Sequence, residues 1–335
     1  MVLQRFFDQS PLTLLAVLAV LLTCIEWCMV WIGRKYRLGP AVSPRSMHRQ
    51  FTPTGGGIVW VVAALIGIVI LWNWAQTGTW IFFFGIIFLA IISYIDDIHP
   101  LPPVPRLISQ IIVMTLTFKQ LFYPQAIDIY LIVIFCGVGI INAINFLDGI
   151  CGMLALYGIV ITGSLIYALS LHSTPSTEYF LPLLIIVLIG QAIFAVFNLR
   201  DTVFAGDLGS ITLGYILVSA TITLILATRD GSYIVFFSVC IFDTGLTTLH
   251  RLFSGYSILQ PHRTNIYQLL TIQYKLPQVV VSIIYALLQM LINALFFLIP
   301  PTQHWTYFLL IATLLTITYF FVRFSFPNNK SNHIL

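Results

Sequence analysis

Residues 179–199, YFLPLLIIVLIGQAIFAVFNL, contain no charged side chain and are long enough to cross a bilayer as a helix, which takes about 20 apolar residues. Similar runs recur along the 335-residue chain, which is 59% hydrophobic and 8% charged, with a mean hydropathy of +0.99. Only helices satisfy every backbone hydrogen bond in lipid over such long, non-alternating runs. The sequence therefore predicts one all-α domain, 1–335, a polytopic membrane bundle of about 11 helices over 11–32, 57–74, 77–95, 107–123, 129–147, 149–171, 179–199, 208–228, 231–249, 276–299 and 304–322.

Basic residues predict the orientation of this bundle. The run 11–32 is too long for a signal peptide, lacks a small-residue cleavage site and is followed by a basic cluster at 34–37, so we expect an uncleaved helix. Connections after odd-numbered runs, together with the C-terminal tail, hold every Lys and Arg except Arg5, Lys119 and Arg229. The positive-inside rule then places the N-terminus outside and the C-terminus in the cytoplasm. Lys119 has to snorkel from the run 107–123.

Six carboxylates lie at predicted helix ends that this orientation places in the cytoplasm. They are Asp96, Asp97, Asp148, Asp201, Asp207 and Asp243. Ionisable groups at the hydrocarbon boundary are costly and are usually retained for a function. Scattered acids would indicate helix caps, whereas acids that converge from four helix ends predict a metal-assisted site facing water.

The loop LGPAVSPRSMHRQFTPTGGG, 38–57, ends in three glycines at a predicted helix start. The N–H groups of Gly55 and Gly56 are candidates for contact with an anion, helped by the helix dipole. Arg45, Ser46 and His48 supply further donors. Close packing of a glycine-rich helix start is the alternative, and taken alone this motif favours it.

The adjacent acids Asp96 and Asp97 precede the rigid segment HPLPPVPR. Neighbouring carboxylates at a low-dielectric boundary repel each other, which predicts a bound cation or a shared proton. Capping of the next helix explains one acid but not both. Asp207, in GDLGS, is either a helix cap or a ligand for a hard metal ion.

Two further motifs offer polar groups to a substrate. Asn142, Asn145 and Asp148 have i, i+3, i+6 spacing and lie near one helical face, where they suit a sugar or nucleotide; interhelical hydrogen bonds are the alternative. The segment 250–268 gathers the cations His250, Arg251, His262 and Arg263 beside Asn265. These fit a phosphate site, and an ordinary amphipathic surface segment is the alternative.

Taken together and in this order, the motifs resemble the polyprenyl-phosphate N-acetylhexosamine-1-phosphate transferase family, of the glycosyltransferase-4 type that includes the phospho-MurNAc-pentapeptide translocase. The resemblance extends from PRSMHRQFTPTGGG through YIDDIHPLPPVPRLISQ, NAINFLDGICG and NLRDTVFAGDLGSITLG to DTGLTTLHRLFSGYSILQPHRTNIYQ. The pattern is nearest to members that initiate O-antigen synthesis.

The resemblance implies a bacterial inner-membrane enzyme with its active site in the cytoplasm. The enzyme would transfer N-acetylhexosamine-1-phosphate from a UDP-sugar to a polyprenyl phosphate such as undecaprenyl phosphate, releasing UMP, in cell-surface polysaccharide or lipopolysaccharide synthesis. It implies Mg²⁺, with Mn²⁺ as a substitute, allows a homodimer and involves no nucleic acid. The implied catalytic residues are Asp96, Asp97, Asp207 and His262, and the implied metal ligands are Asp97 and Asp207. The implied substrate-binding residues are Arg45, Ser46, His48, Gly55, Gly56, Asn142, Asn145, Asp148, Arg200 and Arg263.

Three positions depart from the family pattern. Cys151 stands where the family usually has an acid associated with nucleotide recognition, Asn265 stands where the O-antigen branch has a second His, and Thr54 stands where a basic residue often precedes the glycines. These departures leave open a weakened homologue. The chain has no His triplet like that of the translocase, which argues against a MurNAc-pentapeptide donor.

The main rival from another class is a secondary transporter, whose acids bind protons or ions. Transporter acids are expected near the midplane in broken helices, whereas these acids lie at one face. A CDP-alcohol phosphotransferase would need a different acidic helix motif, which DGICGM lacks.

Overall fold

The structure, a computed structural model, describes residues 12–39, 51–70, 80–121, 127–172, 174–257 and 263–325. These ranges form helices, with no strand among them, and every predicted apolar run contains a helix. The α-helices are α2 (Leu12–Tyr36), α3 (Ile58–Ile70), α4 (Trp80–Ile98), α5 (Pro103–Leu121), α6 (Ile127–Phe146), α7 (Met153–Ser170), α8 (Pro175–Asn198), α9 (Gly206–Thr228), α10 (Ser238–Phe253), α11 (Ile266–Ile272), α12 (Gln278–Leu298) and α13 (His304–Ser325). Short 3-10 helices are η2 (Leu147–Gly149), η3 (Gly231–Phe237) and η4 (Pro301–Gln303).

The predicted class, a polytopic membrane bundle, is confirmed. Within the described ranges, nine helical segments are long and apolar enough to cross a bilayer, and the shorter α3 is also apolar. The α5 helix is not among the nine; it carries Arg106 near its start and Lys119 near its end. The total of eleven spans and the orientation stay predictions.

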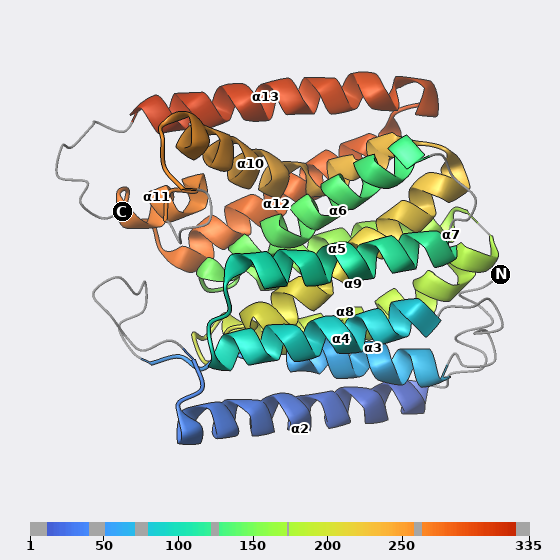
Figure 1. Ribbon diagram of the computed structural model, residues 1–335, viewed down its shortest axis with the longest axis vertical. Helices are drawn as coiled ribbons and strands as arrows, with labels where there is room; N and C mark the ends of the chain where they lie inside the picture. Colours follow the sequence, from blue (N-terminus) through green and yellow to red (C-terminus); the bar gives the residue numbers. More distant parts are fainter. Residues whose placement is uncertain are drawn as a thin grey trace.

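The bundle is built around α9. Side chains of α9 are buried from Leu208 to Leu224 without interruption, because α9 packs against α3, α4, α6, α7 and α8. An apolar helix buried on all sides is typical of the centre of a membrane bundle. The helices lie roughly side by side, with α2 and α13 at opposite edges (Figure 1). The polar sequence motifs are thereby collected at helix ends around the start of α9.

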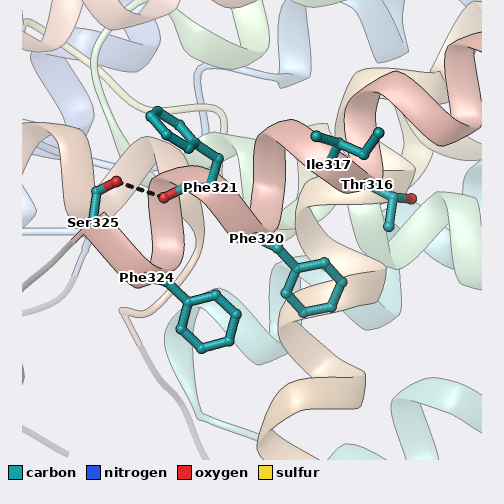
Figure 2. Close-up of a pocket in the computed structure, with 6 residues that line it drawn as sticks. All are labelled: Thr316, Ile317, Phe320, Phe321, Phe324 and Ser325. Carbon is teal, nitrogen blue, oxygen red and sulfur yellow. Dashed lines mark hydrogen bonds between the residues drawn. The ribbon is translucent and has the colours of Figure 1, made fainter.

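The outer face of α13 carries a shallow apolar groove. It is lined by Thr316, Ile317, Phe320, Phe321, Phe324 and Ser325, all from this one helix (Figure 2). Phe321 and Phe324 are more than 70% exposed, which suits contact with lipid hydrocarbon. None of the acids of the sequence motifs lines this groove, so we interpret it as a lipid-facing surface.

Two glycines set the closest approach in the core, where α3 and α9 begin. A Cβ atom added to Gly57 would lie 2.1 Å from Cα of Gly209, and one added to Gly209 would lie 2.5 Å from Cα of Gly57. Small residues let membrane helices approach this closely. The indole N–H of Trp60 donates to the Gly209 carbonyl at 3.1 Å and further fixes the crossing.

This contact predicts a large loss of stability on adding one methyl group. Gly57→Ala should destabilise the protein by about 3 kcal/mol, because backbone atoms rather than a flexible side chain must move. Thermal unfolding in detergent should show a lower midpoint. Gly139→Ala and Gly163→Ala are matched controls, since nothing lies within 4 Å of a Cβ at either position. A Gly57→Ala protein that is as stable as these controls would contradict the close packing.

Candidate active site

Two carboxylates cap the N-terminus of α9. Asp97, from the end of α4, accepts hydrogen bonds from the backbone N–H groups of Asp207 (2.9 Å) and Leu208 (3.1 Å). Asp148, from η2, accepts from those of Ala205 (3.2 Å) and Gly206 (2.7 Å). The first N–H groups of a helix have no partner within the helix, and negative charge near them is stabilising. Capping, which was the structural alternative for these acids, therefore accounts for much of their placement.

Asp96 and Asp207 share a cation supplied by the protein. Nη1 of Arg106 lies 2.6 Å from Oδ2 of Asp96 and 3.0 Å from Oδ2 of Asp207. The other oxygen of Asp96 accepts the backbone N–H of Leu101 at 2.5 Å. Because two carboxylates this close repel each other, the guanidinium between them stabilises the pair. In this structure the cation beside Asp96 is Arg106, from the first turn of α5; the predicted bound ion or shared proton at the Asp96–Asp97 pair stays a prediction.

Arg106 was not identified as a site residue from the sequence, where it contributed only to the count of basic residues. One signal did point to it. Arg106 follows the proline-rich turn after Asp97, and such a turn directs the next helix back along the previous one. The α4 and α5 helices do pack against each other, which brings Arg106 to the acids at the end of α4.

The carboxylates around Arg106 are suited to Mg²⁺. Within the described part of the chain, no group of three or more His, Cys, Asp or Glu residues is arranged as a ready-made metal cage. Mg²⁺ seldom uses such a cage: it takes one or two carboxylates and completes its shell with water and substrate phosphates. Asp96 and Asp207 already face one cationic group together, so their oxygens fit this requirement. Both oxygens of Asp97, the other predicted ligand, are engaged as caps.

The predicted polar face of α6 forms interhelical hydrogen bonds. Nδ2 of Asn142 donates to Oε1 of Gln110 on α5 at 2.6 Å, and Oδ1 of Asn145 accepts from the Ser210 hydroxyl on α9 at 2.6 Å. Both amides therefore form interhelical hydrogen bonds, which were the alternative to substrate binding for this motif. Asp148, the third residue of the motif, caps the N-terminus of α9, as described above. A sugar or nucleotide contact by these residues stays a prediction.

The glycine motif also differs from its predicted use. The N–H of Gly56 donates to the Phe204 carbonyl at 2.9 Å, and that of Gly57 donates to the Ala205 carbonyl at 3.2 Å. In this structure the Gly56 donor is thus used by backbone pairing with the segment before α9, and the anion contact predicted for Gly56 stays a prediction. Gly55 has a φ of +100° and forms the turn into α3, where a left-handed conformation favours glycine.

The remaining predicted residues fall into two groups. Arg45, Ser46, His48 and His262 lie outside the described residues. Arg200 is exposed in the turn after α8, and Arg263 is partly buried shortly before α11. The catalytic role predicted for His262 and the substrate-binding roles predicted for the other five stay predictions.

Cys151 forms a polar cluster with the next loop. Its thiol donates to Oδ1 of Asp201 at 3.2 Å, and the Thr52 hydroxyl donates to the same oxygen at 3.2 Å. Burial, together with the neighbouring carboxylate, raises the pKa of the Cys151 thiol well above its usual range, so the thiol stays neutral. The resemblance leads one to expect an acid at position 151. Cys151 is instead a hydrogen-bond donor, and its partner, Asp201, is an acid from another segment.

The start of α11 is fixed by hydrogen bonds to α10 and the end of α6. Asp243 on α10 accepts the backbone N–H of Ile266 at 2.7 Å and the Tyr285 hydroxyl at 2.8 Å, which holds the start of α11 in place. The Tyr267 hydroxyl then donates to the Phe146 carbonyl, directly before η2. The start of α11 is therefore connected to the end of α6, directly before the helix η2 that carries Asp148.

Comparison with known proteins gives consistent matches. Residues 79–225 match the family model described as glycosyl transferase family 4. A phospho-N-acetylmuramoyl-pentapeptide-transferase from Lactiplantibacillus plantarum is 27% identical over 201 residues, which are 52% of this chain and 61% of the relative. One from Staphylococcus saprophyticus is 27% identical over 248 residues, or 63% and 76% of the two chains. A probable undecaprenyl-phosphate N-acetylglucosaminyl 1-phosphate transferase from Bacillus subtilis is 24% identical over 244 residues, 67% of each.

Over residues 79–225 the chain is therefore similar to glycosyl transferase family 4, in agreement with the resemblance that its motifs predicted. The region matched to the family model includes Asp96, Asp97, Arg106, Asp148 and Asp207, the residues that surround the start of α9. The chain spans about three-fifths of the length of the L. plantarum relative. The nearer resemblance to O-antigen initiators stays a prediction.

Proposed function

We propose that the protein transfers an N-acetylhexosamine-1-phosphate from a UDP-sugar to a polyprenyl phosphate, such as undecaprenyl phosphate, at the cytoplasmic face of a bacterial inner membrane. The product is a polyprenyl-diphospho-sugar, and UMP is released. The observation that carries this proposal is the convergence of Asp96, Asp207 and Arg106 at the start of α9, inside a region similar to a family of phospho-sugar transferases. A role in initiating a cell-surface polysaccharide of the O-antigen type is part of the proposal.

In this reaction the site must bring together two anionic groups, the lipid phosphate and the diphosphate of the donor. An oxygen of the lipid phosphate attacks the β-phosphorus of the donor, a new P–O bond forms, and the bond to the UMP oxygen breaks. Mg²⁺ held by Asp207 with Asp96 or Asp97 would supply charge neutralisation at the diphosphate. Because a phosphate monoester is already largely ionised at neutral pH, we favour direct displacement over an aspartyl-phosphate intermediate.

The chain's own residues have separable tasks in this mechanism. Asp97 and Asp148 hold the α9 N-terminus, which places Asp207. Asp96 lies beside Arg106, where it can orient the acceptor phosphate or take its proton. Before the substrates bind, Arg106 neutralises part of the negative charge of Asp96 and Asp207. When a substrate phosphate is bound, Arg106 can exchange these ion pairs for a contact with a phosphate oxygen.

A secondary transporter is the competing function, and the placement of the acids argues against it. The clustered carboxylates lie at the ends of α4, α6 and α9 rather than midway along broken helices. A midplane ion site would require acids in the middle of these segments.

Release of UMP is the decisive assay. Purified protein incubated with polyprenyl phosphate, Mg²⁺ and separate UDP-N-acetylhexosamines should release UMP with at least one donor and form a lipid-linked diphospho-sugar. Omission of the lipid should abolish release. Catalytically intact relatives assayed in parallel control for the lipid and detergent. A folded protein that releases no UMP with any donor while the relatives do would overturn the proposed activity and favour a weakened homologue.

A further inference from the structure

Arg251 is a buried cation whose hydrogen-bonding capacity is mostly unused. It lies in the last turn of α10 and is 4% exposed. Only Nη2 has an acceptor, the Ser257 carbonyl at 2.9 Å. No described residue accepts from Nε or Nη1, which carry three of the five N–H donors of a guanidinium. Burial of a charged group without partners is unfavourable, so these donors point to a ligand.

The charges around Arg251 are mainly basic, and one acid, Asp243, interacts electrostatically with Arg323. The electrostatic neighbours of Arg251 are Arg323, which repels it, and Tyr256, whose ring centroid lies 5.7 Å from its Cζ atom. Among the described residues, no carboxylate forms an ion pair with either arginine. The positive charge of Arg323 also acts on His250, the residue before Arg251. A second cation this close adds to the cost of burying Arg251, unless an anion binds between them.

Arg323 and Asn265 add two further polar groups to this region. Arg323 donates through Nη1 to the Thr264 carbonyl at 2.6 Å, which places it beside Asn265. Asn265 is 1% exposed and is the N-cap of α11, in a capping box with Gln268; in the described structure its own side-chain atoms have no hydrogen bond of good geometry. Two arginines and one amide donor are a combination suited to phosphate oxygens.

We propose that Arg251, with Arg323 and Asn265, forms a phosphate-binding site between the ends of α10 and α13 and the start of α11. This inference rests on the proposed function, because it assigns the site to a phosphate of one of the two substrates. The bound group is either the diphosphate of the UDP-sugar or the phosphate of the lipid. Tyr267, two residues after Asn265, connects this site to η2 and the acidic cluster.

The turn that follows Arg251 supplies part of the cover over its side chain. The backbone N–H groups of Ser254 and Tyr256 donate to the Arg251 carbonyl, and Gly255 between them has a φ of +78°. The turn 254–257 thus folds over the guanidinium, and the Ser257 carbonyl occupies one donor that a phosphate oxygen would take. Exchange of a neutral carbonyl for a charged phosphate oxygen strengthens that hydrogen bond.

The test measures binding with pairs of probes that differ only in phosphate. The wild-type protein, in nanodiscs of zwitterionic lipid, is titrated with UDP-N-acetylglucosamine and uridine, and separately with undecaprenyl phosphate and undecaprenol. Arg251→Gln should weaken binding of one phosphorylated probe by about 10- to 100-fold, the scale of a lost charge-assisted contact, and leave its phosphate-free counterpart unchanged. The probe that is weakened identifies which substrate the site holds.

Two further variants keep the result interpretable. Arg251→Lys retains the charge but has fewer, less suitably directed donors, so its loss of affinity for the phosphorylated probe should be smaller. Arg251→Lys also keeps the test valid if Arg251→Gln does not fold. Arg34→Gln removes the same charge from the exposed end of α2 and should leave both affinities unchanged. Unchanged affinities for both phosphorylated probes in folded Arg251→Gln and Arg251→Lys would overturn the site. Absence of binding by the wild type to either phosphorylated probe would instead refute the proposed function.

Discussion

Replacing Asp207 with Asn is expected to abolish sugar-phosphate transfer while the helical bundle stays folded. Among the described contacts, the Asp207 carboxylate binds no backbone N–H group and forms an ion pair with Arg106. The substitution therefore removes charge from the reacting region without uncapping a helix. Loss of a metal ligand at a phosphoryl-transfer site removes several kcal/mol of charge stabilisation, so turnover should fall by about 1,000-fold or more. UMP release at saturating donor measures this.

Asp97→Asn is the informative partner of this variant. Both oxygens of Asp97 accept backbone N–H groups of α9, and an amide can accept through one oxygen only. Its NH₂ group would face a second donor, so Asp97→Asn should lower the melting temperature as well as the activity. Asp207→Asn should change the melting temperature little. Near-normal turnover by Asp207→Asn would remove this residue from the catalytic machinery.

The fold was predictable because one interaction dominates it. Lipid permits no unpaired backbone, so long apolar runs such as 208–228 become helices whatever their neighbours are. The apolar runs do not show which helix lies at the centre of the bundle. The α9 helix is buried because Gly57 and Gly209 permit close contact with α3, and that contact depends on two residues far apart in the chain.

The polar site was predictable in its members but less so in their roles. The sequence predicts a catalytic and metal-binding role for Asp97 and a substrate-binding role for Asp148, yet in the structure each binds two N–H groups of the same helix start. A cap can be recognised from sequence when it precedes its own helix, and these caps come from other helices. Arg106 was missed for the same reason: its ion pairs join α5 to α4 and to α9.

Removal of divalent cations is expected to stop turnover, and Mg²⁺ is expected to restore it. Asp96 and Asp207 are held together by one guanidinium, and binding of a donor diphosphate would bring further negative charge to the same place. A single protein cation does not neutralise that charge. EDTA should therefore reduce UMP release to background, and Mg²⁺ should return it, with Mn²⁺ as a weaker or equal substitute. Full activity in EDTA would contradict a metal-assisted mechanism.

Arg106→Gln separates the role of this cation from that of the metal. Nη1 of Arg106 contacts both Asp96 and Asp207, so if these carboxylates hold the metal, arginine and metal would compete for the same oxygens. Removing the guanidinium should tighten Mn²⁺ binding by about 10-fold, the effect of relieving roughly 1.4 kcal/mol of repulsion and competition, while turnover falls because a phosphate contact is lost. Electron paramagnetic resonance of free Mn²⁺ measures the affinity. Lys119→Gln removes the same charge from the far end of α5 and should leave Mn²⁺ affinity unchanged. If Arg106→Gln instead binds Mn²⁺ as the wild type does, the metal does not lie between Asp96 and Asp207.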